Sequence, residues 1–317
     1  MEGKWKAYIF ALVFGVAVPW IVCALGGRVI ASTPECQEIH ITVSEEKPDQ
    51  TIAVLMQGDV QQMLLSDYLT GVILGELPAD FAFEAKKAQA VVARTYALRI
   101  AAGDRHGGAV CGNSACCQSY RDPAAADGKA LQEAREAVLQ TEGMVLTYEG
   151  KLIDATYFSC SGGRTEDAVA VWGTDVPYLQ SVTSPGEEHA AHYTDTVRFS
   201  LQAFADALEQ DLPDDVSQWF GKVNYTHSGS VESMMIGGIS YSGTQLRKLL
   251  GLRSTVFEMF IENNTVAVRT KGFGHRVGMS QYGADAMARS GSDFAQILHH
   301  YYQDVQLETD WYELTNQ

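Results

Sequence analysis

The sequence predicts an α+β protein that is preceded by one N-terminal transmembrane helix. Three observations support this fold class. A run of uncharged, mostly apolar residues lies near the N-terminus. After it come short segments in which apolar and polar residues alternate, as is typical of strands, and longer runs of helix-forming residues between them. The 317 residues are 46% hydrophobic and 20% charged, which is a globular composition, and the chain is long enough for one large or two smaller domains.

The N-terminal run extends from Tyr8 to Leu25 and contains no charged residue. A helix of this length, at about 1.5 Å per residue, is long enough to cross the hydrocarbon core of a membrane. Lys4 and Lys6 precede it, and positive charge favours the cytoplasmic side. We therefore expect a cytoplasmic arm (1–7), a single-pass anchor in the cell membrane (8–26), a linker (27–50) and an extracytoplasmic domain (51–317). A cleaved signal peptide is the alternative, although its apolar region usually has only about 7–15 residues.

The formal net charge of −16 excludes one class of partner. Nucleic acids need basic patches on the proteins that bind them, so we expect no nucleic-acid partner. A neutral or only locally anionic ligand fits better, recognised by a few well-placed Arg residues or backbone N–H groups.

The expected elements follow in chain order. The alternation of apolar and polar residues predicts strands at 39–43 and 51–56. The amphipathic spacing of apolar residues predicts a helix over 60–74. Residues 84–99 are rich in good helix formers with a face of small residues, and a further helix is expected over 124–140. Residues 143–159 read as a β-hairpin that turns at Glu149-Gly150. Helices are also expected from Ser280 onward and over 294–303.

Glu76 is the first candidate for chemistry, because it lies between an apolar helical run and the Leu77-Pro78 turn. Apolar surroundings disfavour a charged carboxylate and raise the pKa of a glutamate, as a general acid requires. The alternative is that Glu76 merely starts or ends a helix. Arg94 falls near the packed face of the next helix, where it either extends along the rim or orients a carboxylate, that of Glu76 or of a ligand.

Two glycine-containing turns are further candidates. Gly162 and Gly163 allow the turn from Ser159 to Thr165 to present N–H groups and hydroxyls to an oxygen-rich ligand, although such turns are also common in plain hairpins. Around His275, three glycines at 272, 274 and 278 force a tight path. That segment lacks the Gly-Lys-Ser/Thr ending of a phosphate loop, so we reject nucleotide binding. His275 is a metal ligand, a base or a structural histidine.

Five ordered segments together resemble the stage II sporulation protein D family. Their order and spacing match across about residues 50–310. The segments are Glu76-Leu-Pro, Ala-Arg94-Thr-Tyr-Ala-Leu, Tyr157-Phe-Ser-Cys-Ser-Gly-Gly-Arg-Thr, Val-Trp172-Gly followed by Pro-Tyr-Leu, and Gly-His275-Arg-Val-Gly-Met-Ser-Gln-Tyr-Gly-Ala. The resemblance implies a mostly antiparallel β core with helices packed around a substrate groove.

The same resemblance implies a peptidoglycan lytic transglycosylase that acts during engulfment in endospore formation. It would cleave MurNAc–GlcNAc bonds of peptide-stripped glycan and form 1,6-anhydroMurNAc, with a cell-wall amidase and membrane proteins of the engulfment machinery as partners. Glu76 would be catalytic, and no cofactor would be required. The residues expected to bind substrate are Arg94, Tyr157, Ser159, Ser161, Gly162, Gly163, Thr165 and Gln281, with Arg94 or Arg164 meeting the lactyl carboxylate. The alternative is a non-catalytic glycan-binding enhancer of an amidase.

A cluster of thiols and an imidazole is the candidate metal site. His106, Cys111, Cys116 and Cys117 lie in one loop and can supply the tetrahedral N/S set that zinc favours, which would make the zinc structural. Clostridial relatives resemble this loop but have a histidine where Cys116 stands. Outside the cytoplasm the alternative is a disulfide from Cys111 to Cys116 or Cys117.

Overall fold

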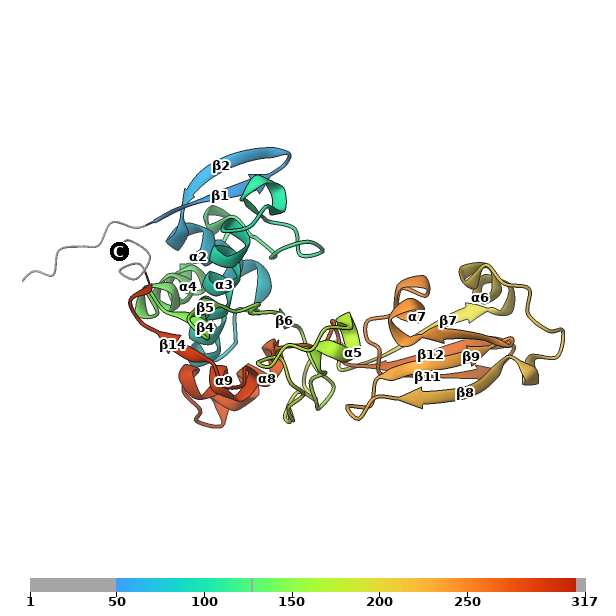
Figure 1. The fold of residues 1–317 in the computed structure, drawn as a ribbon. Helices are drawn as coiled ribbons and strands as arrows, with labels where there is room; N and C mark the ends of the chain where they lie inside the picture. Colours follow the sequence, from blue (N-terminus) through green and yellow to red (C-terminus); the bar gives the residue numbers. More distant parts are fainter. Residues whose placement is uncertain (1–49, 127, 312–317) are drawn as a thin grey trace, which may run out of the picture. The chain divides into compact units, whose positions relative to one another are not determined.

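The computed structural model describes residues 50–126 and 128–311 (Figure 1). The longer helices are α2 (Leu65–Glu76), α3 (Phe83–Ala101), α4 (Gly128–Gln140), α6 (Leu201–Leu208), α8 (Gln281–Arg289) and α9 (Phe294–Tyr301). Shorter helical segments are η1 (Arg105–Gly107), η2 (Pro123–Ala125), α5 (Ala168–Trp172), η3 (Val216–Gln218) and α7 (Gly243–Leu249).

The strands of the described residues are mostly short. They are β1 (Thr51–Met56), β2 (Asp59–Leu64), β3 (Val110–Cys111), β4 (Val145–Tyr148), β5 (Lys151–Leu152), β6 (Tyr157–Phe158), β7 (Thr194–Ser200), β8 (Phe220–Tyr225), β9 (Val231–Ile236), β10 (Ile239–Ser242), β11 (Phe257–Glu262), β12 (Thr265–Lys271), β13 (Met279–Ser280) and β14 (Gln306–Glu308). Most pairings are antiparallel, as predicted, whereas β1 with β3 and β6 with β13 are parallel.

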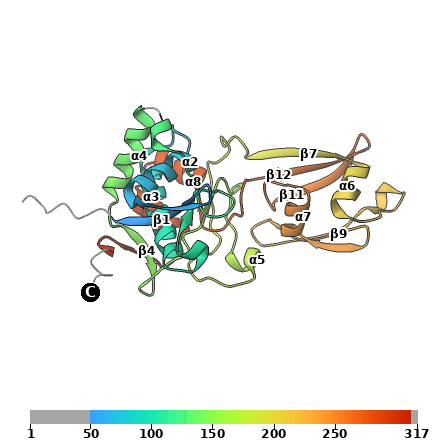
Figure 2. The same cartoon turned by 90° about the horizontal axis from the view of Figure 1, so that it is seen from above.

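A first hydrophobic core forms around α3, which contacts α2, α4, α8 and α9. Figure 2 shows α2, α4 and α8 around α3. Between Ala85 and Ala97 nearly every side chain of α3 is buried, and five of these residues are alanines, at 85, 88, 90, 93 and 97. Small side chains let neighbouring helices approach closely, because a helix packs at a distance set by the residues in contact. The predicted helix over 84–99 with a small-residue face is therefore confirmed.

A second hydrophobic core lies between two three-stranded antiparallel sheets and two helices. The sheets have the orders β10-β9-β8 and β11-β12-β7, and α6 and α7 contact their strands. Phe204 of α6 packs against Trp219 with ring centroids 6.0 Å apart. The sequence had not indicated individual elements in this region, residues 194–271.

Two boundaries differ from the sequence prediction. Residues 59–64 form β2 and not the start of the helix predicted over 60–74, because Gln57 and Gly58, both at positive φ, reverse the chain and pair β2 with β1. The expected helix over 124–140 begins as the separate turn η2 and continues as α4. The hairpin turn at Glu149-Gly150 is confirmed, since β4 pairs with β5 and both turn residues have positive φ.

The predicted anchor (8–26), the linker up to residue 49 and the strand predicted at 39–43 lie outside the described residues. Within residues 50–126 and 128–311, no helix has the length and hydrophobicity needed to span a membrane.

Candidate functional site

A cavity of about 620 Å³ brings together segments from across the chain, and Glu76 is the carboxylate in its lining. The wall comes from the end of α2, the loop that follows β3, strand β6, helix α7 and the segment around His275. The lining residues are Gly75, Glu76, Tyr96, Ser114, Ala115, Cys116, Cys117, Ser119, Thr156, Tyr157, Phe158, Ser159, Arg247, Phe273, Gly274, His275 and Gln281.

Three hydrogen bonds hold the Glu76 carboxylate. Its Oε1 accepts from the backbone N–H of Ser119 at 2.6 Å and from the hydroxyl of Tyr157 at 3.2 Å. Its Oε2 accepts from the side-chain amide of Gln281 at 3.1 Å. Glu76 is therefore in direct contact with Tyr157 and Gln281, which were predicted from separate sequence segments.

Burial raises the pKa of Glu76 above its ordinary value of 4.5, because a charged carboxylate loses solvation there. The hydrogen bonds from Ser119, Gln281 and Tyr157 act in the opposite direction and do not cancel this effect. Glu76 is also the last residue of α2, where the negative end of the helix dipole disfavours another negative charge. A protonated Glu76 would carry its proton on Oε2, since Oε1 already accepts two hydrogen bonds.

Two glycines of α2 bring Ser119 to Glu76. A Cβ on Gly75 would lie 2.9 Å from the backbone carbonyl of Ser119, and one on Gly71 would lie 2.1 Å from the ring of Tyr120. Gly71 and Gly75 are four residues apart, so they form one small-residue surface on the helix. The loop that contains Ser119 packs directly on this surface, which allows its N–H to reach the carboxylate.

Tyr157 and Gln281 both reach Glu76 because β6 and β13 pair in parallel, with Tyr157 opposite Met279. Gln118 is fully buried and holds the phenol: its Nε2 donates to the Tyr157 hydroxyl at 3.1 Å and to the carbonyl of Ala93. Since the Tyr157 oxygen accepts from Gln118, its own proton points to Glu76. The sequence analysis missed Gln118 and Ser119, although both follow directly after the cysteine loop.

The turn from Ser159 to Thr165 has two different roles. Ser159 lines the cavity, and its contact with substrate stays a prediction. The N–H groups of Ser161 and Gly162 instead donate to Glu187 Oε2 at 2.8 and 2.9 Å, as does the Ser161 hydroxyl at 2.8 Å. The turn does bind a carboxylate, but it is the fully buried Glu187 of the same chain.

The cavity wall does not include four of the residues that were predicted to contact substrate, and their contacts stay a prediction: Ser161, Gly162, Gly163 and Thr165. Gly163 donates its N–H to Ser161, and Thr165 pairs with Val182. Glu187 was missed because nothing in its local sequence, Pro-Gly-Glu-Glu, distinguishes it from a surface turn.

The predicted substrate contact of Arg94 is corrected, because Arg94 has a structural role. Its side chain is 2% exposed, and the guanidinium donates to the backbone carbonyls of Met144 and Val138 at 3.1 and 3.2 Å. Arg164 donates to the hydroxyl of Ser181 at 3.2 Å and does not line the cavity. The cation in the cavity wall is Arg247, which the sequence analysis did not single out.

His275 lines the cavity, and the centroid of its ring lies 5.5 Å from that of Phe158 and 5.6 Å from that of Trp172. Burial lowers its pKa to about 4, with the positive charge of Arg247 acting in the same direction. Its Nδ1 accepts from the N–H of Val277. His275 is thus neutral at pH 7 and is not part of a metal-ligand cluster among the described residues.

The predicted metal ligands do gather. One ligand atom from each of His106, Cys111, Cys116 and Cys117 lies within 4.8 Å of the others, and all described cysteines are free thiols. His106 Nε2 is 3.2 Å from Cys116 Sγ, and the Sγ atoms of Cys116 and Cys117 are 4.0 Å apart. Zinc–ligand bonds of 2.0–2.3 Å at tetrahedral angles require edges of about 3.5–3.8 Å, so the donor set fits zinc.

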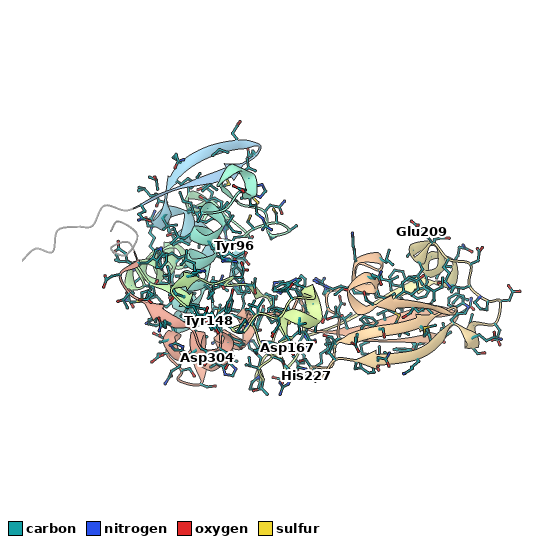
Figure 3. All side chains as sticks on the ribbon, in the orientation of Figure 1. Tyr96, Tyr148, Asp167, Glu209, His227 and Asp304 are labelled. Carbon is teal, nitrogen blue, oxygen red and sulfur yellow. The ribbon has the colours of Figure 1, made fainter. Side chains whose placement is uncertain are left out.

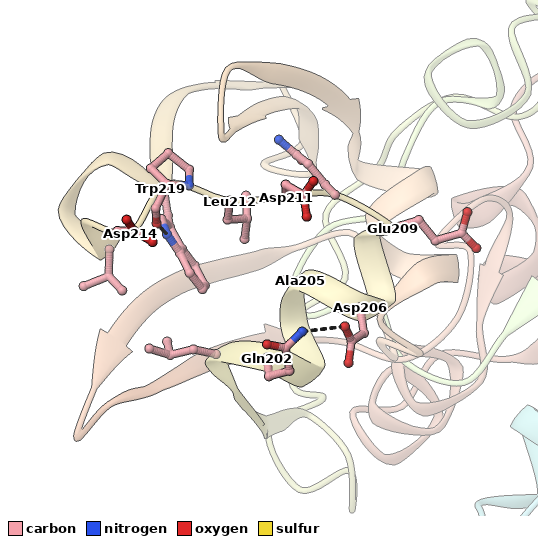
Figure 4. A pocket seen from close by; sticks show the side chains of 12 residues that line it. Gln202, Ala205, Asp206, Glu209, Asp211, Leu212, Asp214 and Trp219 are labelled. Carbon is pink, nitrogen blue, oxygen red and sulfur yellow. Dashed lines mark hydrogen bonds between the residues drawn. The ribbon is translucent and has the colours of Figure 1, made fainter.

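Two other places in the described part of the chain gather acidic side chains. A cavity of about 590 Å³ beside α6 is lined by four carboxylates, Asp206, Glu209, Asp211 and Asp214 (Figure 4). Asp167 and His227, labelled in Figure 3, form a cluster with Glu166. Its members are already engaged, because Asp167 is 3.3 Å from His227 and Glu166 accepts from Thr226. Neither place contains a buried polar group that lacks a partner.

Comparison with known proteins identifies the family. Residues 56–148 match the family model described as Stage II sporulation protein. The chain is 37% identical to stage II sporulation protein D of Bacillus amyloliquefaciens, over 89% of this chain and 85% of that protein. It is 36% identical to the Bacillus subtilis (strain 168) protein of the same name, over 78% of this chain and 75% of that protein.

A further relative is an amidase enhancer of Bacillus subtilis (strain 168), 30% identical over 75% of this chain and 40% of that protein. The resemblance inferred from the five sequence segments is therefore confirmed over most of the chain. On these matches, the chain belongs to the stage II sporulation protein D family.

Proposed function

We propose that this protein is a lytic transglycosylase that cleaves MurNAc–GlcNAc bonds in peptide-stripped peptidoglycan. The observation that carries the proposal is Glu76, a carboxyl with a raised pKa in the wall of a cavity and with three donors fixing its position. Glu76 is the sole carboxylate among the described residues of that wall. Ordinary glycosidases need two carboxyl groups, whereas a lytic transglycosylase replaces water by a hydroxyl of the sugar itself.

The proposed reaction uses Glu76 first as an acid and then as a base. Protonated Oε2 gives its proton to the glycosidic oxygen as the bond from that oxygen to the anomeric carbon breaks. The MurNAc 6-hydroxyl then attacks the anomeric carbon, and Oε2 takes up the hydroxyl proton. The substrate delivers this nucleophile at high effective concentration, and no water is consumed.

The donors around Glu76 support both steps. After proton transfer the carboxylate is negative, and Ser119, Tyr157 and Gln281 already point hydrogen-bond donors at it. Donors that are in position before the reaction need no reorganisation when the charge develops. Burial raises the pKa of Tyr157 well above its ordinary value, so its hydroxyl stays protonated and remains a donor.

Several aspects of the cellular role belong to the same proposal. The substrate is the glycan strand of peptidoglycan, and Tyr157 and Ser159 are candidates to contact its sugars. A cell-wall amidase and membrane proteins of the engulfment machinery are the proposed partners. Residues 8–26 would anchor the protein in the cell membrane, with its catalytic domain outside the cytoplasm.

Product analysis tests the proposed activity. The full chain in detergent micelles would be incubated with peptide-stripped glycan, and the products would be identified by mass spectrometry. We expect fragments that end in 1,6-anhydroMurNAc. A reducing-end MurNAc as the main product would mean hydrolysis. No cleavage, together with faster release of stem peptides by an added amidase, would instead support a non-catalytic enhancer, the second candidate that the amidase-enhancer relative favours.

Zinc in the cysteine loop is a separate proposal. His106, Cys111, Cys116 and Cys117 would hold the ion, which would order the loop and so fix Ser119 against Glu76. Because metal binding is coupled to folding, a chelator should lower the thermal unfolding temperature, and Cys111→Ser should lower it without a chelator. Elemental analysis should find one zinc per chain. Its absence, with a Cys111 disulfide in peptide mapping, would reject zinc in favour of the bridge.

A further inference from the structure

Arg247 of α7 brings a positive charge from the second hydrophobic core to the wall of the Glu76 cavity. The remaining members of this wall within the described chain include no lysine and no other arginine. Arg247 is close enough to His275 for its charge to lower the pKa of that imidazole. Arg247 therefore lines the same cavity as Glu76, on an element that contributes no residue to the first core.

The charge of Arg247 has no partner within residues 50–126 and 128–311: no hydrogen bond or ion pair connects its guanidinium to the protein there. Its pKa is lowered, because its partial burial removes solvation that nothing replaces. A partly desolvated cation is stabilised when an anion of suitable geometry binds to it. Arginine suits a carboxylate in particular, since its planar fork can donate two parallel hydrogen bonds.

The other arginines named in the sequence motifs cannot bind a carboxylate in this cavity. Arg94 and Arg164 are directed to backbone carbonyls and to a hydroxyl away from the cavity. Arg276 is 1% exposed and donates to the carbonyls of Ser161, Arg164 and Ser228. Arg247 differs from all three because it lines the cavity.

We propose that Arg247 binds the free lactyl carboxylate of a MurNAc residue and so makes the site selective for glycan that has already lost its stem peptides. This inference rests on the proposed function, since it assigns one contact within the same substrate. In a peptide-bearing strand the lactyl group is an amide and carries no negative charge at that position. An amide-hydrolysing enzyme must therefore act first, because it creates the anion that Arg247 recognises.

Binding measurements on an inactive background test this inference. The full chain carrying Glu76→Gln, in detergent micelles, would be titrated with three glycans: peptide-stripped strands, peptide-bearing strands and a neutral chitooligosaccharide of GlcNAc alone. The second substitution would be Arg247→Gln, with Arg247→Lys as the conservative variant. Lys222→Gln is the matched control, because it removes one positive charge from an exposed position of β8.

We expect Arg247→Gln to weaken binding of peptide-stripped strands by about tenfold or more, the usual effect of losing a charge-assisted hydrogen bond. Binding of the chitooligosaccharide should change by less than about twofold. Arg247→Lys should restore part of the affinity, and Lys222→Gln should have no effect. The preference for stripped over peptide-bearing strands should disappear with Arg247→Gln.

Three results would overturn the inference, and they differ in what else they overturn. Unchanged affinity of Arg247→Gln for stripped strands would remove the lactyl contact but leave the proposed function intact. An equal loss for stripped strands and for chitooligosaccharide would assign Arg247 to general packing, again leaving that function intact. Failure of the Glu76→Gln parent to bind any of the three glycans would reject the proposed function and this inference together.

Discussion

Glu76 and Glu187 are two carboxylates that serine-containing loops hold by similar contacts, yet their surroundings differ. Glu187 is fully buried and accepts five hydrogen bonds: two backbone N–H groups and three hydroxyls, from Ser161, Ser184 and Ser280. Glu76 accepts three and lies in the wall of a cavity.

The difference shows what separates a structural carboxylate from a candidate catalytic one. Five donors occupy all the usual positions around the two oxygens of Glu187, so that no substrate atom can approach them. At Glu76, Oε2 accepts one hydrogen bond in a residue that lines the cavity, and burial raises the pKa of the group. A turn of Ser and Gly residues is compatible with a structural and with a catalytic carboxylate. Whether a substrate can reach the carboxylate oxygens decides between the two roles.

The largest expected effect is on activity at Glu76. Glu76→Gln keeps the shape of the side chain and removes the transferable proton, so turnover of stripped glycan should fall about 10²-fold or more. Anhydro-sugar release would be measured by chromatography, with the exposed Glu142→Gln as a matched control. Turnover close to that of the wild type would show that Glu76 is not the acid, and the contrast with Glu187 would then have no functional meaning.

At Glu187 we expect a substitution to lower the stability of the fold, whereas at Glu76 we expect it to lower turnover. Glu187→Gln converts charge-assisted hydrogen bonds from Ser161 and Gly162 into neutral ones, although the hydroxyls of Ser184 and Ser280 can rotate towards the new amide. We expect a loss of about 2 kcal/mol in the free energy of unfolding, measured by urea denaturation. An unchanged unfolding midpoint would mean that the five contacts contribute little, and that the turn is free to serve another ligand.

A smaller effect is expected when the loop is moved away from Glu76. Gly75→Ala places a Cβ 2.9 Å from the backbone of Ser119, so the loop must shift and the hydrogen bond to Oε1 should weaken. Turnover should fall about tenfold. Gly128→Ala is the control, since a Cβ there meets no atom within 4 Å. Full activity of Gly75→Ala would show that the Ser119 contact is dispensable.

The smallest expected effect is on the pH dependence of stability, and it tests the raised pKa that distinguishes Glu76 in the comparison with Glu187. The pKa of Glu76 is raised in the folded state, so the contribution of this group to stability is present below its ordinary pKa of 4.5 and is lost as the pH rises through the folded value. The stability of the wild type relative to Glu76→Gln should therefore decline from acidic to neutral pH. A difference between the two proteins that stays constant, or that grows towards neutral pH, would contradict a raised pKa.

Local patterns predicted those residues whose role depends on their own segment. The apolar helix before Glu76 and the proline turn after it already indicated a carboxyl with a raised pKa, and the strand and turn segments supplied Tyr157 and Gln281. Arg94 could not be assigned in this way. An arginine near the packed face of a helix fits both a ligand contact and a buried structural role, and only the carbonyls of Met144 and Val138 decide between them.

The sequence by itself determined the family, the hairpin, the long helix α3 and the candidate acid, because these follow from local periodicity and from ordered motifs. Tertiary structure alone decided which donors reach Glu76, that Glu187 occupies the Ser-Gly turn, and that Arg247 lines the cavity. The hydrogen bonds to Glu76 and from the turn to Glu187 join residues 25 to 205 positions apart in the chain. No local pattern specifies such pairs, since they depend on how close the packed elements come, as Gly75 illustrates.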